Sequence, residues 1–291
     1  MKRILFPAAL AALVLLAACG DDKAASEASQ APSAPSKIVS LSPTGTEMLF
    51  AIGAGGQVLA VDDQSDYPAE ALQKPHDLSG FEPNVEAIAA LEPDLVVIGD
   101  DFTGLTPQLE ALGITVWSGP AAKSFDDAYA QIEQLGAVTG HVGEAAELVL
   151  KMQTDIDAVV QAAPKAAQPL TYYHELDNTY YSVTDNTFVG QVYSLFGLQS
   201  IADFQEVSGN FPQLAAEAII SADPDFIFLA DGSFGESPDT VAARPGWEAL
   251  KAVTNGNVVV VDDDLSSRWG PRIVDFVSAV SAVVAKATVS G

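Results

Sequence analysis

An internal repeat constrains the fold of this chain more than any other feature of its sequence. The segment Asn84–Asp100 (NVEAIAALEPDLVVIGD) resembles the segment Ala215–Asp231 (AAEAIISADPDFIFLAD) without a gap, and matched residues are 131 positions apart. Each copy predicts a short helix, a Pro-Asp turn and an apolar run of strand length that ends in Asp. We therefore expect two lobes of similar βα topology.

A long helix is predicted between the two copies. Residues 143–163 place apolar side chains at steps of three and four, and Pro164 follows the last of them. Elsewhere strands alternate with helices, which favours parallel sheets. The predicted fold class is α/β, with mainly parallel sheets in an N-terminal lobe (37–140) and a C-terminal lobe (166–291). One long rigid helix within 141–165 joins these lobes, and the whole binding domain covers about 37–291.

The N-terminus has the pattern of a secretory signal peptide, predicted at residues 1–18. Lys2 and Arg3 precede an apolar run that is too short to remain as a membrane-spanning helix. The run ends in Leu16-Ala17-Ala18-Cys19, which resembles the lipobox of bacterial lipoproteins. We expect a lipidated Cys19, a flexible Ala/Ser/Pro-rich linker over 19–36, and an extracytoplasmic protein anchored to the bacterial cell membrane only through this lipid.

Composition excludes several classes of function. Cys19 is the single cysteine, so the chain can form neither an internal disulfide nor a multi-cysteine metal site. A formal net charge of −26 makes nucleic acid an unsuitable partner. There is no nucleophile elbow, P-loop or metal-ligand spacing. We predict no catalytic residue, metal site or resident cofactor, and a monomer that is not an enzyme. An enzyme on a similar bilobal fold stays open as an alternative.

Four motifs in order resemble the iron-siderophore and vitamin B12 class of periplasmic binding proteins. They are Ser40–Gly53 (SLSPTGTEMLFAIG), Ser65–Pro68 (SDYP), Pro83–Val97 (PNVEAIAALEPDLVV) and Arg268–Asp275 (RWGPRIVD). The nearest likeness is to the cobalamin-binding branch. The resemblance implies a class III solute-binding fold and, as partner, an ABC permease dimer with its ATPase subunits. A sensor or accessory lipoprotein that uses the same cleft without a transporter is the alternative.

The predicted ligand site lies beyond the carboxyl ends of the strands, where ligands of open α/β sheets bind. The loops expected there carry seven aromatic residues: Tyr67, Phe102, Tyr180, Tyr181, Phe188, Phe234 and Trp269. Aromatic walls suit a large, flat, partly apolar ligand such as a corrin or a porphyrin. The alternative is that each of these aromatics covers the local core. From this set, Tyr67, Phe102, Tyr181, Phe188 and Trp269 are the predicted ligand contacts.

Asp264 and Arg268 are the predicted polar contacts of the ligand. The resemblance implies that they reach the polar edge of a cobalamin, since Arg donates to amide or phosphate oxygens and Asp accepts from amide groups. The alternative is an ordinary ion pair in a loop. One departure is that the loop Gly80-Phe81-Glu82 lacks the Trp that cobalamin binders can place there.

The chelate itself is ranked as cobalamin or a related corrinoid first, a ferric siderophore second and haem third. Haem would require an axial His or Tyr, and nothing singles out one of the three histidines, His76, His141 and His174.

Glu86 and Glu217 occupy the same position of the two repeat copies. Each is expected in the first turn of a helix, where a carboxylate interacts favourably with the helix dipole. That preference explains a Glu at either position but not its recurrence in both lobes. The resemblance implies that one surface Glu of each lobe docks onto basic residues of the two permease subunits.

Overall fold

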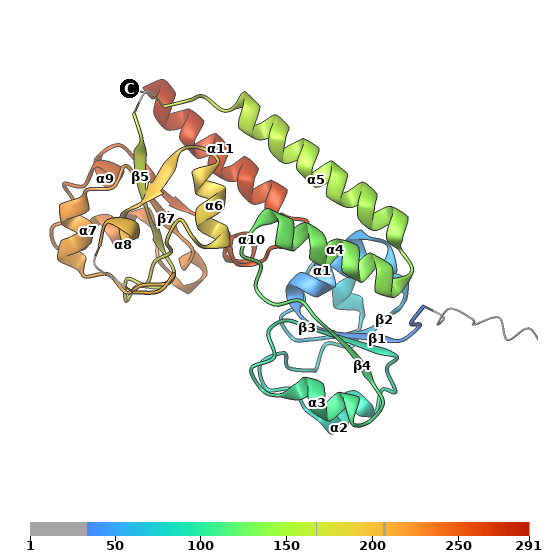
Figure 1. The fold of residues 1–291 in the computed structure, drawn as a ribbon. Coiled ribbons are helices and arrows are strands. Elements are labelled where there is room, and N and C mark those ends of the chain that lie inside the picture. Colours follow the sequence, from blue (N-terminus) through green and yellow to red (C-terminus); the bar gives the residue numbers. More distant parts are fainter. Residues whose placement is uncertain (1–33, 167, 206–207, 291) are drawn as a thin grey trace, which may run out of the picture. The chain divides into compact units, whose positions relative to one another are not determined.

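The computed structural model describes residues 34–166, 168–205 and 208–290, so the predicted signal peptide and Cys19 lie outside the described residues. Within these ranges the strands form two parallel sheets of four strands, in the orders β2-β1-β3-β4 and β6-β5-β7-β8 (Figure 1). The predicted α/β class is confirmed. The strands are β1 (Ile38–Leu41), β2 (Val58–Val61), β3 (Leu95–Ile98), β4 (Thr115–Ser118), β5 (Leu170–Glu175), β6 (Leu198–Ser200), β7 (Phe226–Leu229) and β8 (Val258–Val260).

The two sheets share one strand order, which confirms the duplication predicted from the repeat. Strands β3 and β7 start at Leu95 and Phe226, matched positions of the two copies. The repeated Asp of the Pro-Asp turn has the same role in both lobes. Asp94 Oδ2 accepts a hydrogen bond from the Lys37 N–H (3.0 Å), just before β1, and Asp225 Oδ2 accepts one from the Thr171 N–H (2.9 Å), in β5. The turn therefore ties the start of each repeat strand to its neighbour.

The predicted long helix is α5, Val142–Ala162. It packs along α4 (Phe125–Thr139) and α11 (Ile273–Ser290), as Figure 1 shows. Its apolar stripe buries Ala145, Val149, Met152 and Ile156. Because α5 stands between the lobes in sequence and packs on helices from both, it joins them through a packed core.

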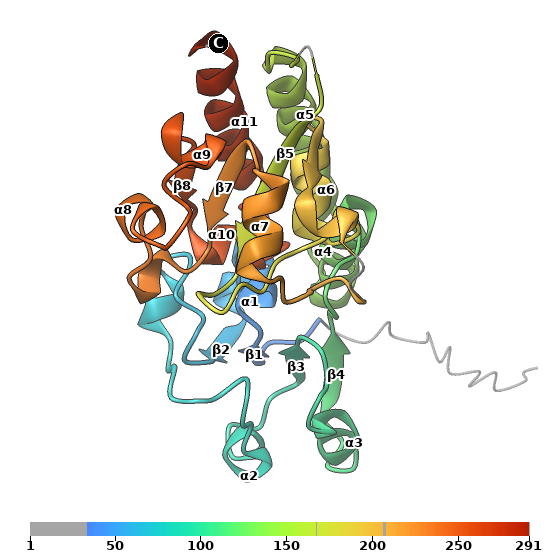
Figure 2. The same ribbon diagram turned by 90° about the vertical axis from the view of Figure 1, so that its left-hand side faces the viewer.

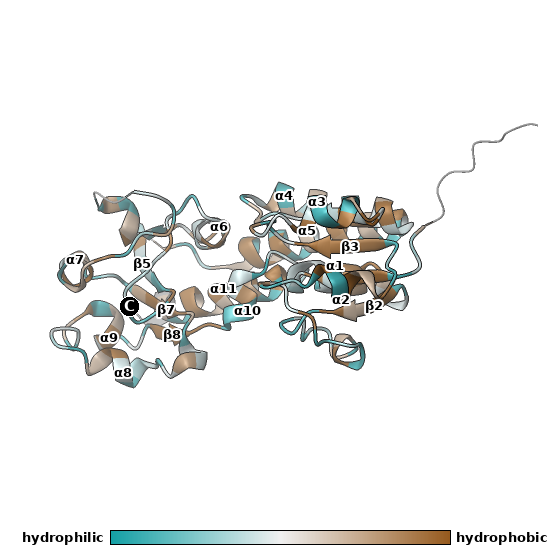
Figure 3. Cartoon of the chain, turned by 90° about the horizontal axis from the view of Figure 1, so that it is seen from below, coloured by the Kyte–Doolittle hydropathy of each residue, from teal (hydrophilic) through white to brown (hydrophobic). Residues whose placement is uncertain are grey.

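Alternation along the strands produces separate apolar clusters on the two faces of each sheet. One face of each sheet contributes to a single continuous cluster, with Leu95 and Phe226 among its members. The helices α1 (Pro43–Ala51), α4, α5, α6 (Phe188–Ser194) and α11 supply most of the other members. The opposite face of the first sheet packs on α2 (Val85–Ala89) and α3 (Leu105–Glu110). That of the second sheet packs on α7 (Ala216–Ala222), which lies beside β5 and β7 in Figure 2. Strand β3 is hydrophobic throughout, whereas α2 carries hydrophilic segments (Figure 3).

The sequence of residues 262–271 predicts a loop, but in the structure this segment contains a short helix, α10 (Asp263–Ser267). Asp262 caps this helix, its Oδ1 accepting a hydrogen bond from the Leu265 N–H at 3.1 Å. Asp263 and Asp264 occupy the first turn, where negative charge is favourable. The sequence also predicts one short helix near Trp247, whereas the structure has two, α8 (Pro238–Ala242) before this residue and α9 (Lys251–Thr254) after it. In the described ranges, no helix is both long and apolar enough to cross a membrane.

Candidate functional site

Two neighbouring cavities open at the carboxyl ends of the strands, where the sequence predicts the ligand site. One, of about 330 Å³, is lined by residues that follow β1, β2 and β3. The other, of about 400 Å³, is lined by residues that follow β4, β5, β7 and β8. Ser267 and Trp269 line both cavities. Each volume is at the small end of the range of small-molecule sites, so a large ligand would have to occupy both cavities.

The two cavities differ in chemistry. We call the first one the polar cavity, because Asp62, Asp100, Asp264 and Arg268 are among its lining residues. We call the second one the apolar cavity, and its walls include Leu176, Val183, Phe188, Phe211 and Phe234. Trp269 divides them, and its Nε1–H donates a hydrogen bond to Gln131 Oε1 at 2.8 Å, which fixes the plane of the indole ring.

The start of α1 forms one wall of the polar cavity. Ser42 caps the helix, and its Oγ accepts a hydrogen bond from the Gly45 N–H at 3.1 Å. Gly45 is required for close packing, because a Cβ there would lie 2.6 Å from Val97 Cγ1 in β3. Thr46 Oγ1 lies 2.9 Å from Ser65 Oγ and so ties the loop after β2 to this helix.

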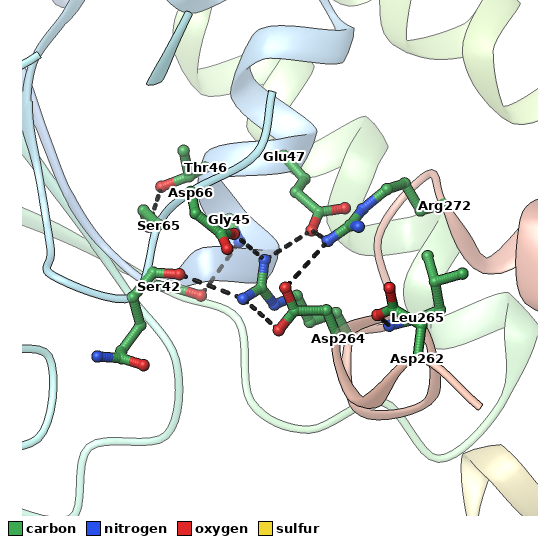
Figure 4. A network of polar contacts seen from close by, with 12 residues as sticks. Ser42, Gly45, Thr46, Glu47, Ser65, Asp66, Asp262, Asp264, Leu265 and Arg272 are labelled. Carbon is green, nitrogen blue, oxygen red and sulfur yellow. Dashed lines mark hydrogen bonds and ion pairs between the residues drawn. The ribbon is translucent and has the colours of Figure 1, made fainter. Parts of the chain in front are cut away.

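A network of ion pairs centred on Glu47 includes Asp264 and Arg268, two of the residues that line the polar cavity (Figure 4). Arg268 Nη1 and Arg272 Nη2 both donate to Oε1 of Glu47, at 3.1 Å and 2.6 Å, and the Glu47 side chain is only 1% exposed. Arg268 also contacts Asp66 Oδ1 at 3.0 Å and Asp264 Oδ1 at 2.5 Å. Three carboxylates therefore surround one guanidinium group.

Asp264 and Arg268, the predicted polar contacts of the ligand, form an ion pair with each other. This arrangement agrees with the alternative given for them, an ordinary ion pair within the protein. Both residues also line the polar cavity. Burial raises the pKa of the Asp264 carboxyl, while the charge of Arg268 lowers it. Sequence reasoning missed Glu47, although a Glu between buried apolar residues of a helix signals a charged partner from elsewhere in the chain.

Three of the five predicted aromatic contacts line the cavities, and two do not. Phe188 and Trp269 line the apolar cavity, and Phe102, 91% exposed, lies with Trp269 at the polar one. Tyr67 lines neither cavity, and the Arg272 guanidinium lies over its ring, 4.2 Å from the centroid. Tyr181 also lines neither, and it forms an isolated bridge with Gln213.

Tyr180, expected at the cleft, stacks on Trp247 instead, with ring centroids 5.8 Å apart. Trp247 is fully buried in the cluster on the outer face of the second sheet, so Tyr180 covers this core. The alternative interpretation, in which the aromatic residue covers the local core, is therefore correct for Tyr180. Phe211 and Phe81 line the cavities without having been predicted, since neither follows a predicted strand directly.

Asp62 is the first residue after β2 and lines the polar cavity. Its side chain is 1% exposed, and within the described part of the chain its Oδ1 has no hydrogen-bond partner. Burial raises the pKa of this carboxyl to about 6, against the lowering effect of hydrogen bonds from Ser65 and Gln64. The sequence signal was an Asp that directly follows the apolar run Val58–Val61.

A second buried carboxylate cluster involves Glu175 and Asp231, which are next in sequence to the lining residues Leu176 and Ala230 of the apolar cavity. Arg244 binds Glu175 with two parallel hydrogen bonds of 2.6 Å, and Glu175 is fully buried. Asp231 is 2% exposed, and neither of its carboxylate oxygens has a hydrogen-bond partner among the described residues. Burial first, and the charge of Glu175 second, raise the pKa of Asp231 to about 7.

Glu86 and Glu217 are exposed residues in the first turns of α2 and α7. These helices precede β3 and β7, so the two glutamates are structurally equivalent. Neither residue lines the cavities described above.

A larger cavity, of about 630 Å³, lies where α5 ends and β5 begins. Its walls include Pro164–Ala166 and Gln168, on either side of residue 167, and none of the predicted site residues. It is therefore set aside in favour of the cavities at the strand ends. In the described residues, no group of three or more His, Cys, Asp or Glu side chains is arranged to hold a metal ion.

Comparison with known proteins identifies relatives along most of the chain. Residues 38–265 match the family described as periplasmic binding protein. An uncharacterized ABC transporter substrate-binding lipoprotein, YvrC of Bacillus subtilis, is 31% identical over 255 residues, which cover 85% of this chain and 79% of that protein. A cobalamin-binding protein of Halobacterium salinarum is 31% identical over 252 residues, 84% of this chain and 68% of that protein.

Solved structures have the same fold. The periplasmic vitamin B12 binding protein BtuF of Vibrio cholerae superposes with a TM-score of 0.72 at 26% identity, covering 87% of this chain and 98% of that one. The periplasmic heme-binding protein BhuT, in complex with two hemes, has a TM-score of 0.77 at 20% identity, over 88% of this chain and 100% of that one. The second likeness concerns the fold alone.

Proposed function

Since this chain belongs to the periplasmic binding protein family, we propose that it binds cobalamin or a related corrinoid in its cleft and delivers it to an ABC importer. Its relatives include proteins named for cobalamin, and its structural neighbours include proteins named for vitamin B12 and for heme. The choice among these chelates rests on one observation, the charge of the two cavities.

The cleft is rich in carboxylates and poor in available cations. Among the described lining residues of both cavities, Asp62, Asp100, Asp263 and Asp264 are acidic, and Arg268 is the single basic residue. Arg268 is already surrounded by Glu47, Asp66 and Asp264. An anionic ligand would therefore meet a negative potential without a free cation to compensate it.

Cyanocobalamin fits this environment because it is uncharged overall and its ring carries many carboxamide groups. Carboxamide N–H groups are donors that carboxylates accept well. Phe188, Phe234 and Trp269 offer apolar surface to the face of a macrocycle. Haem carries two propionates and a ferric tricatecholate carries several negative charges, so both are disfavoured on the same grounds.

A ferric hydroxamate siderophore is the second candidate, since such chelates are uncharged or cationic. A screen by visible absorbance separates these possibilities, with cyanocobalamin, ferrioxamine B, hemin and a ferric tricatecholate each added to the purified protein. The proposal predicts a complex with cyanocobalamin. Binding of hemin or the tricatecholate, with none of cyanocobalamin, would reject the charge argument and the corrinoid assignment together.

The anchor and the permease contacts complete the proposed function. Leu16-Ala17-Ala18-Cys19 supports lipidation at Cys19, and the Bacillus subtilis relative is itself described as a lipoprotein. Glu86 and Glu217 are the proposed contacts with the two permease subunits, because they are exposed and structurally equivalent.

A further inference from the structure

One acceptor in the wall of the polar cavity has no partner within the described protein. Asp62 is 1% exposed, and its Oδ1 receives no hydrogen bond from the described residues. A buried carboxylate oxygen without a donor is unfavourable by an amount comparable to a lost hydrogen bond, and more when it is charged. Such a group in a cavity wall accepts its hydrogen bond from solvent in the empty cavity or from a bound ligand.

The surroundings of Asp62 hold its carboxylate in place without satisfying it. Ser65 and the backbone of Gln64 donate hydrogen bonds to the carboxylate. Gly80 leaves space beside it, since a Cβ at Gly80 would lie 2.7 Å from Asp62 Oδ2 and 3.0 Å from the carbonyl oxygen of Leu41. The side chain is thus fixed from the protein side, and Asp62 and Gly80 both line the cavity.

Within the described part of the chain, the charged groups around Asp62 supply no cation for it. Asp63, its neighbour in sequence, repels a negative charge at Asp62. Across the polar cavity stand Asp100, whose Oδ2 accepts from the Ala121 N–H at 3.1 Å, and Asp264, which pairs with Arg268. A bound molecule that displaces solvent from this cavity is therefore in position to supply the donor for Asp62 Oδ1.

We propose that Asp62 determines specificity in this cleft, its free Oδ1 accepting a hydrogen bond from an N–H group of the ligand. This inference rests on the proposed function, and the donor it names is a carboxamide on the rim of a corrinoid. The same carboxylate disfavours a ligand that presents a carboxylate at this position, because two acceptors with like charge would face each other.

Titration calorimetry with cyanocobalamin, on the full chain solubilised from membranes in detergent, tests the assignment. Asp62→Asn keeps the shape of the side chain and removes its charge. It should weaken binding roughly 10-fold or more. A matched control, Asp63→Asn, changes an exposed neighbour that lines neither cavity, and it should stay within about 2-fold of the wild type.

Two further readouts separate recognition from a structural role. Wild-type affinity should fall as the pH is lowered through about 6, where Asp62 gains a proton, and the affinity of Asp62→Asn should not follow this profile. Asp62→Asn should also discriminate less against a cyanocobalamin derivative in which one ring carboxamide is replaced by a carboxylate. Thermal melts establish that each variant is folded.

The outcomes are distinct. If the wild type binds cyanocobalamin and Asp62→Asn binds it equally well with the same pH profile, the inference about Asp62 is wrong and the proposed function stands. If the folded wild type does not bind cyanocobalamin, the proposed function and this inference both fail.

Discussion

Glu47 and Arg268 are 221 residues apart in the chain, yet Arg268 Nη1 donates a hydrogen bond to Glu47 Oε1 at 3.1 Å. Glu47 belongs to α1, which packs on the first sheet, whereas Arg268 follows α10, which leads from the second sheet into α11. The pair therefore joins the start of the chain's fold to its end. Arg272 binds the same Glu47 oxygen, so a single carboxylate holds both arginines.

Replacing Glu47 should destabilise the protein strongly. Glu47→Gln removes the charge that compensates two partly buried guanidinium groups, and breaking such a buried pair costs about 3–5 kcal/mol. For a chain of this size each kcal/mol corresponds to about 2–4 °C in melting temperature. Thermal unfolding followed by circular dichroism measures the change.

The matched control is Glu92→Gln, because Glu92 forms an exposed ion pair with Lys37 at 3.5 Å. Exposed pairs contribute about 0–1 kcal/mol, so this variant should melt near the wild type. Equal melting temperatures for the two variants would mean that the Glu47 network is not important for stability.

Asp231 should make stability depend on pH in a defined direction. Its pKa is about 7 in the folded protein against an ordinary value of 3.8. The folded state therefore holds an extra proton between these values, and the free energy of unfolding falls as the pH rises from about 4 to about 7. Asp231→Asn should raise stability at pH 8, by an amount on the order of 1–4 kcal/mol, and the gain should vanish near pH 4.

Asp100→Asn is the control offered by the duplication, since Asp100 is the matched residue of the first repeat copy and is exposed. It should show no gain at pH 8. Melting curves at pH 4, 6 and 8 provide the comparison, and a gain for Asp231→Asn that did not change with pH would contradict the titration assigned to this residue.

Cys19→Ser tests the anchor. Without a thiol to receive a lipid, the protein should move from the membrane fraction to the soluble extracytoplasmic fraction, since stable attachment requires acyl chains. Fractionation and immunoblotting measure this shift. A variant that stayed in the membrane fraction to the same extent as the wild type would disprove lipid anchoring at Cys19.

Glu86→Lys together with Glu217→Lys tests docking on the permease. Exposed charges contribute little to affinity singly, but at an interface they set the association rate and the orientation of the partners. Uptake of cyanocobalamin by cells should be lost in the double variant and partly reduced in each single one. Ligand affinity of the isolated protein should be unchanged in all three. Normal uptake by the double variant would contradict the docking proposal. The two glutamates would then serve only to stabilise the N-termini of their helices.

The repeat made most of the fold predictable. A constant offset of 131 residues placed β3 and β7 correctly, and a stripe of apolar residues placed α5. β6 was missed because Leu198–Ser200 is only three residues long and contains a polar Gln, too little for a strand pattern. The acidic run Asp262–Asp264 suggested a loop, although its first residue is the cap of α10.

The cleft was predictable in location but not in detail. The rule that ligands bind beyond the carboxyl ends of strands indicated the loops that line the two cavities with Phe102, Phe188, Phe234 and Trp269. This rule could not show that Tyr180 stacks on Trp247, because the two rings come into contact only in the folded chain. Nor could it show that Arg268 is engaged by Glu47, a contact between opposite ends of the domain. Side-chain partners at such sequence separations depend on tertiary packing.

Direct titration of the wild-type protein with cyanocobalamin in a calorimeter tests the central claim, that this cleft accepts a neutral, donor-rich corrinoid. The account predicts saturable binding of one cyanocobalamin per chain, and no comparable heat with hemin or a ferric tricatecholate. Tight binding of either anionic chelate, with no heat from cyanocobalamin, would contradict it.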